Sequence, residues 1–155
     1  MAAILLIQRI WKMKDTQETI RKKRILLVED ERETRDLIRS LLSLDAHEVV
    51  EANNGAEAIS LFTQSHFDLV MTDHKMPFLT GIELAVRIRR LAPSKPILMI
   101  TGHNHKSGPG NPVNVVLRKP FGVETLRSAV TRLLSLAEEA ASAPNASDEL
   151  MYSDF

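Results

Sequence analysis

The chain has 155 residues, 44% of them apolar and 26% charged, which suits one soluble globular domain with a hydrophobic core. Lys plus Arg and Asp plus Glu number 20 each, so no overall positive charge points to nucleic acid or to an anionic membrane as a partner. The absence of cysteine excludes disulfides, zinc–thiolate sites and thiol catalysis, and it agrees with the cytoplasmic location that we expect.

Residues 1–23 contain a short apolar run followed closely by basic residues. A membrane-spanning helix needs about 20 apolar residues, and this run is far shorter. A secretory signal would place its basic residues before the apolar stretch. We therefore expect a leader without a membrane span, either weakly ordered or folded into a short amphipathic helix that carries Ile4, Ile7 and Trp11. Met13 also remains open as the true start.

Short apolar runs alternate with helical patterns from Arg24 onward. The expected strands are residues 24–28, 47–52, 67–72, 96–100 and 113–118. The expected helices are 31–44, one capped by Asn54, one that opens at Thr80-Gly81 and closes at Pro93, and 122 to about 141. The expected inward positions are Leu37, Ile38, Leu41 and Leu44; Ala58, Ile59 and Phe62; Leu84, Ile88 and Leu91; and Val123, Leu126, Val130, Leu133 and Ala137. This alternation predicts a parallel sheet with helices on both faces.

One crossover departs from the alternation. Residues 102–112 contain three glycines and two prolines. Each interior Gly costs a helix roughly 1 kcal/mol and each Pro about 3 kcal/mol, so we expect a loop there with at most one helical turn. Residues 142–155 lack periodicity and are expected to form a disordered tail, which leaves residues 24–141 as the folded domain.

Polar residues stand at the C-terminal ends of four of the strands. Glu29 and Asp30 follow the first strand, and the third, fourth and fifth run into Asp73, Thr101 and Lys119. Open parallel sheets bind ligands at the edge where their strands end, so these side chains are expected to meet. Clustered carboxylates need a cation, and oxygen ligands of this kind favour Mg²⁺. Because a carboxylate can accept a phosphoryl group whose charge an ammonium and a hydroxyl stabilise, the set predicts phosphoryl transfer onto aspartate.

Each of these residues also has an ordinary alternative role. Asp30 could cap the helix that follows it, Thr101 could merely end a strand, and Lys119 could be a solvated charge. Three histidines leave a transition-metal site open, although spacing alone is a weak sign of metal ligation; they are His74, His103 and His105.

Four segments, in order, resemble the response-regulator receiver domain, the phosphoacceptor module of two-component signalling. They are residues 24–31 (RILLVEDE), 68–77 (DLVMTDHKMP), 98–102 (LMITG) and 117–121 (LRKPF), and the resemblance extends over residues 24 to about 137. It implies an α/β fold: a flavodoxin-like, doubly wound, five-stranded parallel sheet with strand order 2-1-3-4-5. The family's fourth helix falls on residues 102–112 and is expected to be short or absent.

The resemblance also implies roles for the residues at the strand ends. Asp73 would be phosphorylated, Thr101 would bond the phosphoryl group and Lys119 would pair with it. Mg²⁺ would be held by Glu29, largely through water, and by Asp30, Asp73 and the backbone carbonyl of Lys75. Lys119-Pro120 would be a cis peptide bond. The implied partner is a sensor histidine kinase or a histidine phosphotransfer domain, docked near the first helix and residues 120–121.

Two features depart from the family on the face that usually reports phosphorylation: Val116 stands where the family has Tyr or Phe, and 102–112 stands where it has a helix. We expect a phosphoacceptor that acts as a stand-alone, single-domain response regulator or phosphorelay intermediate. It would be a signalling protein rather than an enzyme, although it could catalyse its own phosphorylation and dephosphorylation. The alternatives are a non-phosphorylated protein-interaction module that keeps the fold, and a phosphatase that uses Asp73 as its nucleophile.

Overall fold

A computed structural model describes residues 22–103 and 109–142 of the chain. The elements in these ranges are β1 (Arg24–Val28), α2 (Arg32–Leu44), β2 (Glu48–Ala52), α3 (Gly55–Gln64), β3 (Leu69–Asp73), α4 (Gly81–Leu91), β4 (Ile97–Thr101), β5 (Val115–Arg118) and α5 (Val123–Ser142). Apart from residues 22–23 and 142, the expected leader and tail lie outside the described residues. No helix in the described part of the chain is long and apolar enough to cross a membrane.

The five strands form one parallel sheet in the order β2-β1-β3-β4-β5, which confirms the predicted doubly wound topology. Asp73 lies opposite Ile100, and Thr101 lies opposite Arg118. Because every pair of neighbouring strands is parallel, all five strands end at the same edge of the sheet. This edge therefore collects the side chains that follow β1, β3, β4 and β5.

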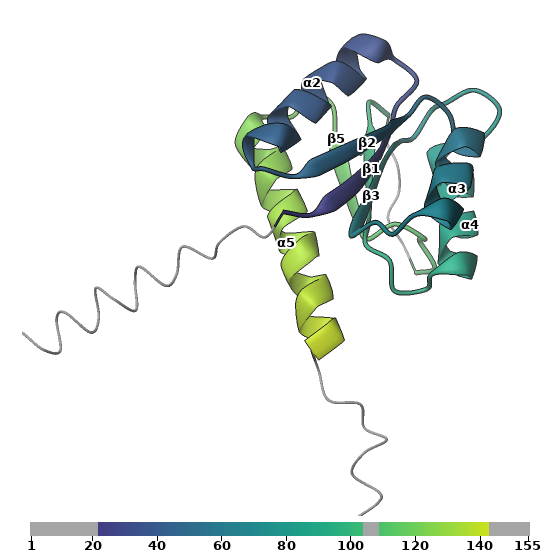
Figure 1. The fold of residues 1–155 in the computed structure, drawn as a ribbon. Helices are drawn as coiled ribbons and strands as arrows, with labels where there is room; N and C mark the ends of the chain where they lie inside the picture. Colours follow the sequence, from purple (N-terminus) through teal and green to yellow (C-terminus); the bar gives the residue numbers. More distant parts are fainter. Residues whose placement is uncertain (1–21, 104–108, 143–155) are drawn as a thin grey trace, which may run out of the picture.

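Helices cover both faces of the sheet, with α2 and α5 on one face and α3 and α4 on the other (Figure 1). Alternate residues of β1 serve the two faces: Ile25 and Leu27 pack towards α2 and α5, whereas Leu26 and Val28 pack towards α3 and α4. A strand buried on both sides reads as a continuous apolar run, which explains the sequence of β1.

Several helix positions that were expected to face inward are exposed. In α2 the buried residues are Ile38 and Leu42, while Leu37 is 58% exposed and Leu44 is 78% exposed. Ile38 and Leu42 are four residues apart and share one face, from which Leu37 and Leu44 are rotated away. The same correction applies to the terminal residues of two further helices, Leu91 and Val123.

Helices α3 and α4 begin where the sequence predicts, after Asn54 and at Thr80-Gly81. The Asn54 side chain accepts a hydrogen bond of 2.8 Å from the backbone N–H of Glu57. Thr80 and Glu83 form a reciprocal capping box at the start of α4. Such caps satisfy backbone N–H groups that a helix start otherwise leaves unpaired, so they fix where both helices begin.

The connection from β4 to β5 contains no helix in its described residues, 102–103 and 109–114. Arg89 of α4 spans this region instead: its guanidinium donates to the carbonyl of Pro112 at 2.9 Å and to Oδ1 of Asn114 at 2.6 Å. Oδ1 of Asn114 also accepts from the N–H of Ile97 at 2.8 Å. Arg89 therefore ties α4 to the starts of both β4 and β5.

Candidate functional site

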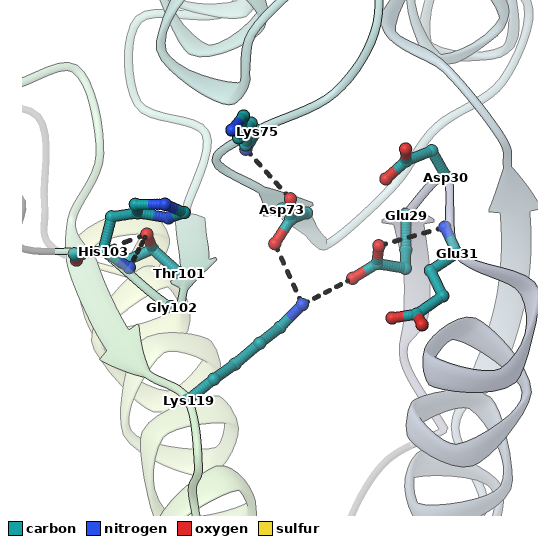
Figure 2. Close-up of a pocket in the computed structure, with 9 residues that line it drawn as sticks. All are labelled: Glu29, Asp30, Glu31, Asp73, Lys75, Thr101, Gly102, His103 and Lys119. Carbon is teal, nitrogen blue, oxygen red and sulfur yellow. Dashed lines mark hydrogen bonds and ion pairs between the residues drawn. The ribbon is translucent and has the colours of Figure 1, made fainter.

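The C-terminal edge of the sheet carries an open pocket of about 320 Å³ (Figure 2). All the residues predicted for the site line it: Glu29, Asp30, Asp73, Lys75, Thr101 and Lys119. Glu31 and Gly102 also line the pocket and were not among the predicted site residues, although each directly follows one of them in the sequence. The strand ends therefore bring three carboxylates, an ammonium and a hydroxyl into one hollow.

Asp73 ends β3 and points into the pocket, with only 8% of the residue exposed. Its Oδ1 lies 3.0 Å from Nζ of Lys119, and its Oδ2 accepts a 2.9 Å hydrogen bond from the backbone N–H of Lys75. The two oxygens are thus held from opposite sides, one by a side chain that follows β5 and one by the loop after β3. This fixes the orientation of the carboxylate plane.

Glu29 is the most buried carboxylate of the site, with 2% of the residue exposed. Its Oε2 pairs with Nζ of Lys119 at 3.1 Å, and its Oε1 accepts a 3.2 Å bond from the N–H of Glu31. Burial, together with the nearby charge of Asp73, raises the pKa of Glu29. Burial works against the charge of Lys119, but hydrogen bonds to Asp73 and Glu29 outweigh it and raise the pKa of the ammonium.

The site contains more negative charge than Lys119 can neutralise. One carboxylate oxygen from each of Glu29, Asp30 and Asp73 lies within 4.8 Å of the others. Three oxygens at this spacing fit a single hard divalent cation such as Mg²⁺. No histidine belongs to this group, the only such cluster of metal-ligating side chains that the described residues form; His105 lies outside them. The donor set therefore favours an oxygen-ligated ion over a transition metal.

Thr101 ends β4 beside Asp73 and is almost fully buried, with 1% exposed. Its Oγ1 accepts a 3.0 Å hydrogen bond from the N–H of His103 and lies 3.4 Å from the carbonyl oxygen of the same residue. Nδ1 of His74 lies 3.5 Å from the same oxygen. The Thr101 hydroxyl therefore contacts both His103 and His74.

The loop after Asp73 is packed tightly against the start of α4. The N–H of Gly81 donates to the carbonyl of His74 at 2.9 Å. A Cβ at Gly81 would lie 2.2 Å from the backbone oxygen of Asp73, a distance that no side chain can occupy. Glycine is therefore required here so that α4 can begin beside Asp73. On the opposite side of the pocket, Lys119-Pro120 is a cis peptide bond, as the resemblance implies.

Comparison with known proteins places this site in a family context. The family model described as the response regulator receiver domain matches residues 25–131. The response regulator MprA of Mycobacterium leprae is 33% identical over 115 residues, which make up 72% of this chain and 50% of MprA. The autoinducer 1 sensor kinase/phosphatase LuxN of Vibrio campbellii is 32% identical over 80 residues, or 52% of this chain and 9% of LuxN. The chain thus spans about half the length of MprA.

Two solved structures share the fold over most of the chain. The response regulator TrrA of Thermotoga maritima, in complex with Mg²⁺ and BeF, aligns with a TM-score of 0.68 and 32% identity, over 72% of this chain and 98% of TrrA. The chemotaxis protein CheY4 of Vibrio cholerae aligns with a TM-score of 0.68 and 29% identity over the same shares. The Mg²⁺-bound relative is consistent with the acidic pocket described above.

Proposed function

The chain belongs to the response regulator receiver domain family, and from that premise we propose that Asp73 accepts a phosphoryl group from a phosphohistidine of a partner protein. One observation carries the proposal. The Asp73 carboxylate lies 3.0 Å from the Lys119 ammonium, and the oxygens of two further carboxylates lie within 4.8 Å of its own, in a pocket open to solvent. This combination holds an anionic nucleophile beside the positive charge that an incoming phosphoryl group needs.

In the proposed reaction an oxygen of Asp73 attacks phosphorus, so that an O–P bond forms and the P–N bond of the phosphohistidine breaks. The released imidazole keeps the bonding electrons and takes up a proton. The N–H of Lys75 would orient the attacking carboxylate, while Lys119 and the Thr101 hydroxyl, which line the same pocket, would bond phosphoryl oxygens. When bound by the carboxylates and the Lys75 carbonyl, Mg²⁺ would neutralise charge on those oxygens.

We place this function in residues 24–141, which would act as the receiver of a response regulator or as a phosphorelay intermediate. The proposed partner, a histidine kinase or a phosphotransfer domain, would dock beside the pocket on α2 and residues 120–121. In support, Leu37 of α2 is 58% exposed, and Pro120 is exposed too. The relative LuxN is named a sensor kinase/phosphatase, so this chain is similar to part of a protein whose name includes a kinase function. This similarity supports a kinase as the proposed partner.

A second candidate function is a protein-interaction module that is not phosphorylated. Two observations favour it. Val116 offers no aromatic ring to report a change at Thr101, and the described residues between β4 and β5 form no helix that could move. Both concern the output face rather than the phosphoacceptor pocket, so they bear on signalling after phosphorylation.

Intact-mass measurement after incubation with acetyl phosphate and Mg²⁺ tests the proposal. We expect the wild type to gain one phosphoryl group and Asp73→Asn to gain none. Asp68→Asn is the matched control, because Asp68 directly precedes β3, at the end opposite to Asp73, and its carboxylate accepts from the backbone N–H of Arg24. If Asp73→Asn were labelled as fully as the wild type, the proposal would be wrong. If neither acetyl phosphate nor a phosphorylated phosphotransfer domain labels the wild type, the second candidate replaces the first.

A further inference from the structure

His74 and Thr101 are neighbours across two adjacent strands at the edge of the pocket. Asp73 lies opposite Ile100 in the β3–β4 pair, and the N–H of His74 donates to the carbonyl of Ile100 at 2.9 Å. This pairing brings Nδ1 of His74 to 3.5 Å from Oγ1 of Thr101, at the outer limit of a hydrogen bond. We propose that His74 is a positioning residue that holds the Thr101 hydroxyl and thereby limits how fast Asp73 is phosphorylated, an inference that rests on the proposed function.

The hydroxyl has a single proton, and its surroundings determine where that proton points. Oγ1 of Thr101 already accepts a 3.0 Å bond from the N–H of His103. The hydroxyl proton can then be donated to the carbonyl of His103 at 3.4 Å or, in the histidine tautomer that leaves Nδ1 unprotonated, to Nδ1 of His74 at 3.5 Å. With 1% of the residue exposed, Thr101 has almost no access to bulk water as a further partner.

A phosphoryl group on Asp73 would need the same proton. When the hydroxyl donates to Nδ1 of His74, it cannot donate to a phosphoryl oxygen at the same time, since a hydroxyl has only one O–H. His74 therefore competes with the phosphoryl group for Thr101. Removing the ring nitrogen should eliminate one of the two competitors for the hydroxyl proton, leaving the carbonyl of His103, and speed adduct formation. One long neutral hydrogen bond corresponds to a change of about two- to five-fold in rate.

A double-mutant cycle tests whether His74 acts through Thr101. His74→Phe keeps a ring and removes both nitrogens, whereas His74→Asn keeps an oxygen acceptor close to the position of Nδ1. Thr101→Val removes the hydroxyl and keeps the shape of the side chain. The measured quantity is the rate at which acetyl phosphate with Mg²⁺ adds a phosphoryl group, followed by intact mass.

We expect His74→Phe to raise the rate by about two- to five-fold and His74→Asn to restore a rate near that of the wild type. In the Thr101→Val background we expect His74→Phe to have no effect. An unchanged rate, or a change of equal size in both backgrounds, would overturn the inference. If the wild type forms an adduct but the effect of His74→Phe does not depend on Thr101, only the role of His74 is refuted. A wild type that forms no adduct with any donor refutes the proposed function, and the inference with it.

Discussion

Replacing Asp30 by Asn should stabilise the metal-free protein and weaken its response to Mg²⁺. Asp30 is exposed at the rim of the pocket, and the carboxylates of Glu29 and Asp73 lie within 4.8 Å of its own. Asn has nearly the same shape as Asp and carries no charge. The substitution therefore removes repulsion in the empty site and, at the same time, removes one anionic ligand for the cation.

The size of the effect follows from these distances. At 4.8 Å, the upper limit of these separations, and the dielectric constant of water, about 80, each like-charge pair costs about 0.9 kcal/mol. Asp30 forms two such pairs, and the positive charge of Lys119, which lines the same pocket, offsets part of the repulsion. We therefore expect a net gain of about 1 kcal/mol in the free energy of unfolding without Mg²⁺ at low ionic strength. A cation that binds only the folded state adds about 2.7 kcal/mol to the free energy of unfolding when its concentration is one hundred times its Kd. At the same concentration, a variant that binds the cation more weakly loses most of this stabilisation.

Urea unfolding with and without Mg²⁺ measures both effects on the same protein. The stability of Asp30→Asn should exceed that of the wild type without Mg²⁺ and fall below it, or equal it, when Mg²⁺ saturates the wild type. Asp36→Asn is the control, because Asp36 is an exposed acid on α2 that pairs with Arg39 at 3.3 Å, away from the pocket. The reasoning fails if Asp30→Asn destabilises the metal-free protein, or if Mg²⁺ stabilises it as much as the wild type.

Further substitutions test the packing around the site. Arg89→Met should cost about 2 kcal/mol in urea unfolding, because the partly buried carbonyl of Pro112 and the Asn114 side chain lose a charged donor. Arg90→Met on the exposed face should cost much less, and equal losses would refute the tie between α4 and β5. Gly81→Ala should cost about 1–3 kcal/mol and slow labelling of the protein by acetyl phosphate, while Gly102→Ala, where a Cβ meets nothing within 4 Å, should leave the free energy of unfolding unchanged. Burial lowers the pKa of His47 below its usual 6.5, so as the pH falls the unfolded chain takes up a proton at a higher pH than the folded protein does. The free energy of unfolding should therefore decrease as the pH drops through 6.5. His47→Gln should flatten this pH dependence, and an unchanged dependence would contradict the reasoning.

The meeting of the site residues was predictable because it depends on the topology of the sheet. Once β1, β3, β4 and β5 are parallel neighbours, residues that follow them must share one edge, whatever the details of packing. The start of α4 was predictable for a similar reason, since a Thr80–Glu83 capping box is a local interaction. Features that depend on strand order or on short-range sequence can therefore be inferred from the chain alone.

The details of packing were not predictable from the same patterns. Helical spacing allowed Leu44 of α2 to face inward, but the position of α2 against the sheet buries Leu42 instead. The burial of Glu29, which raises its pKa, and the contact between His74 and Thr101 both depend on how β1, β3 and β4 sit side by side. The contacts of Arg89 with Pro112 and Asn114 gave no signal in the sequence either, because these partners lie 23 and 25 residues further along the chain.

The central claim is that Asp73 is the residue that receives phosphate, and chemical trapping of the adduct tests it most directly. An acyl phosphate is reduced by borohydride to an alcohol, so a phosphorylated aspartate is converted to homoserine in the peptide chain. After phosphorylation with Mg²⁺ and reduction, peptide mass mapping should find homoserine at position 73 and at no other acidic residue. Homoserine at another position, such as 30 or 68, or none in a protein that has gained a phosphoryl group, would contradict the claim.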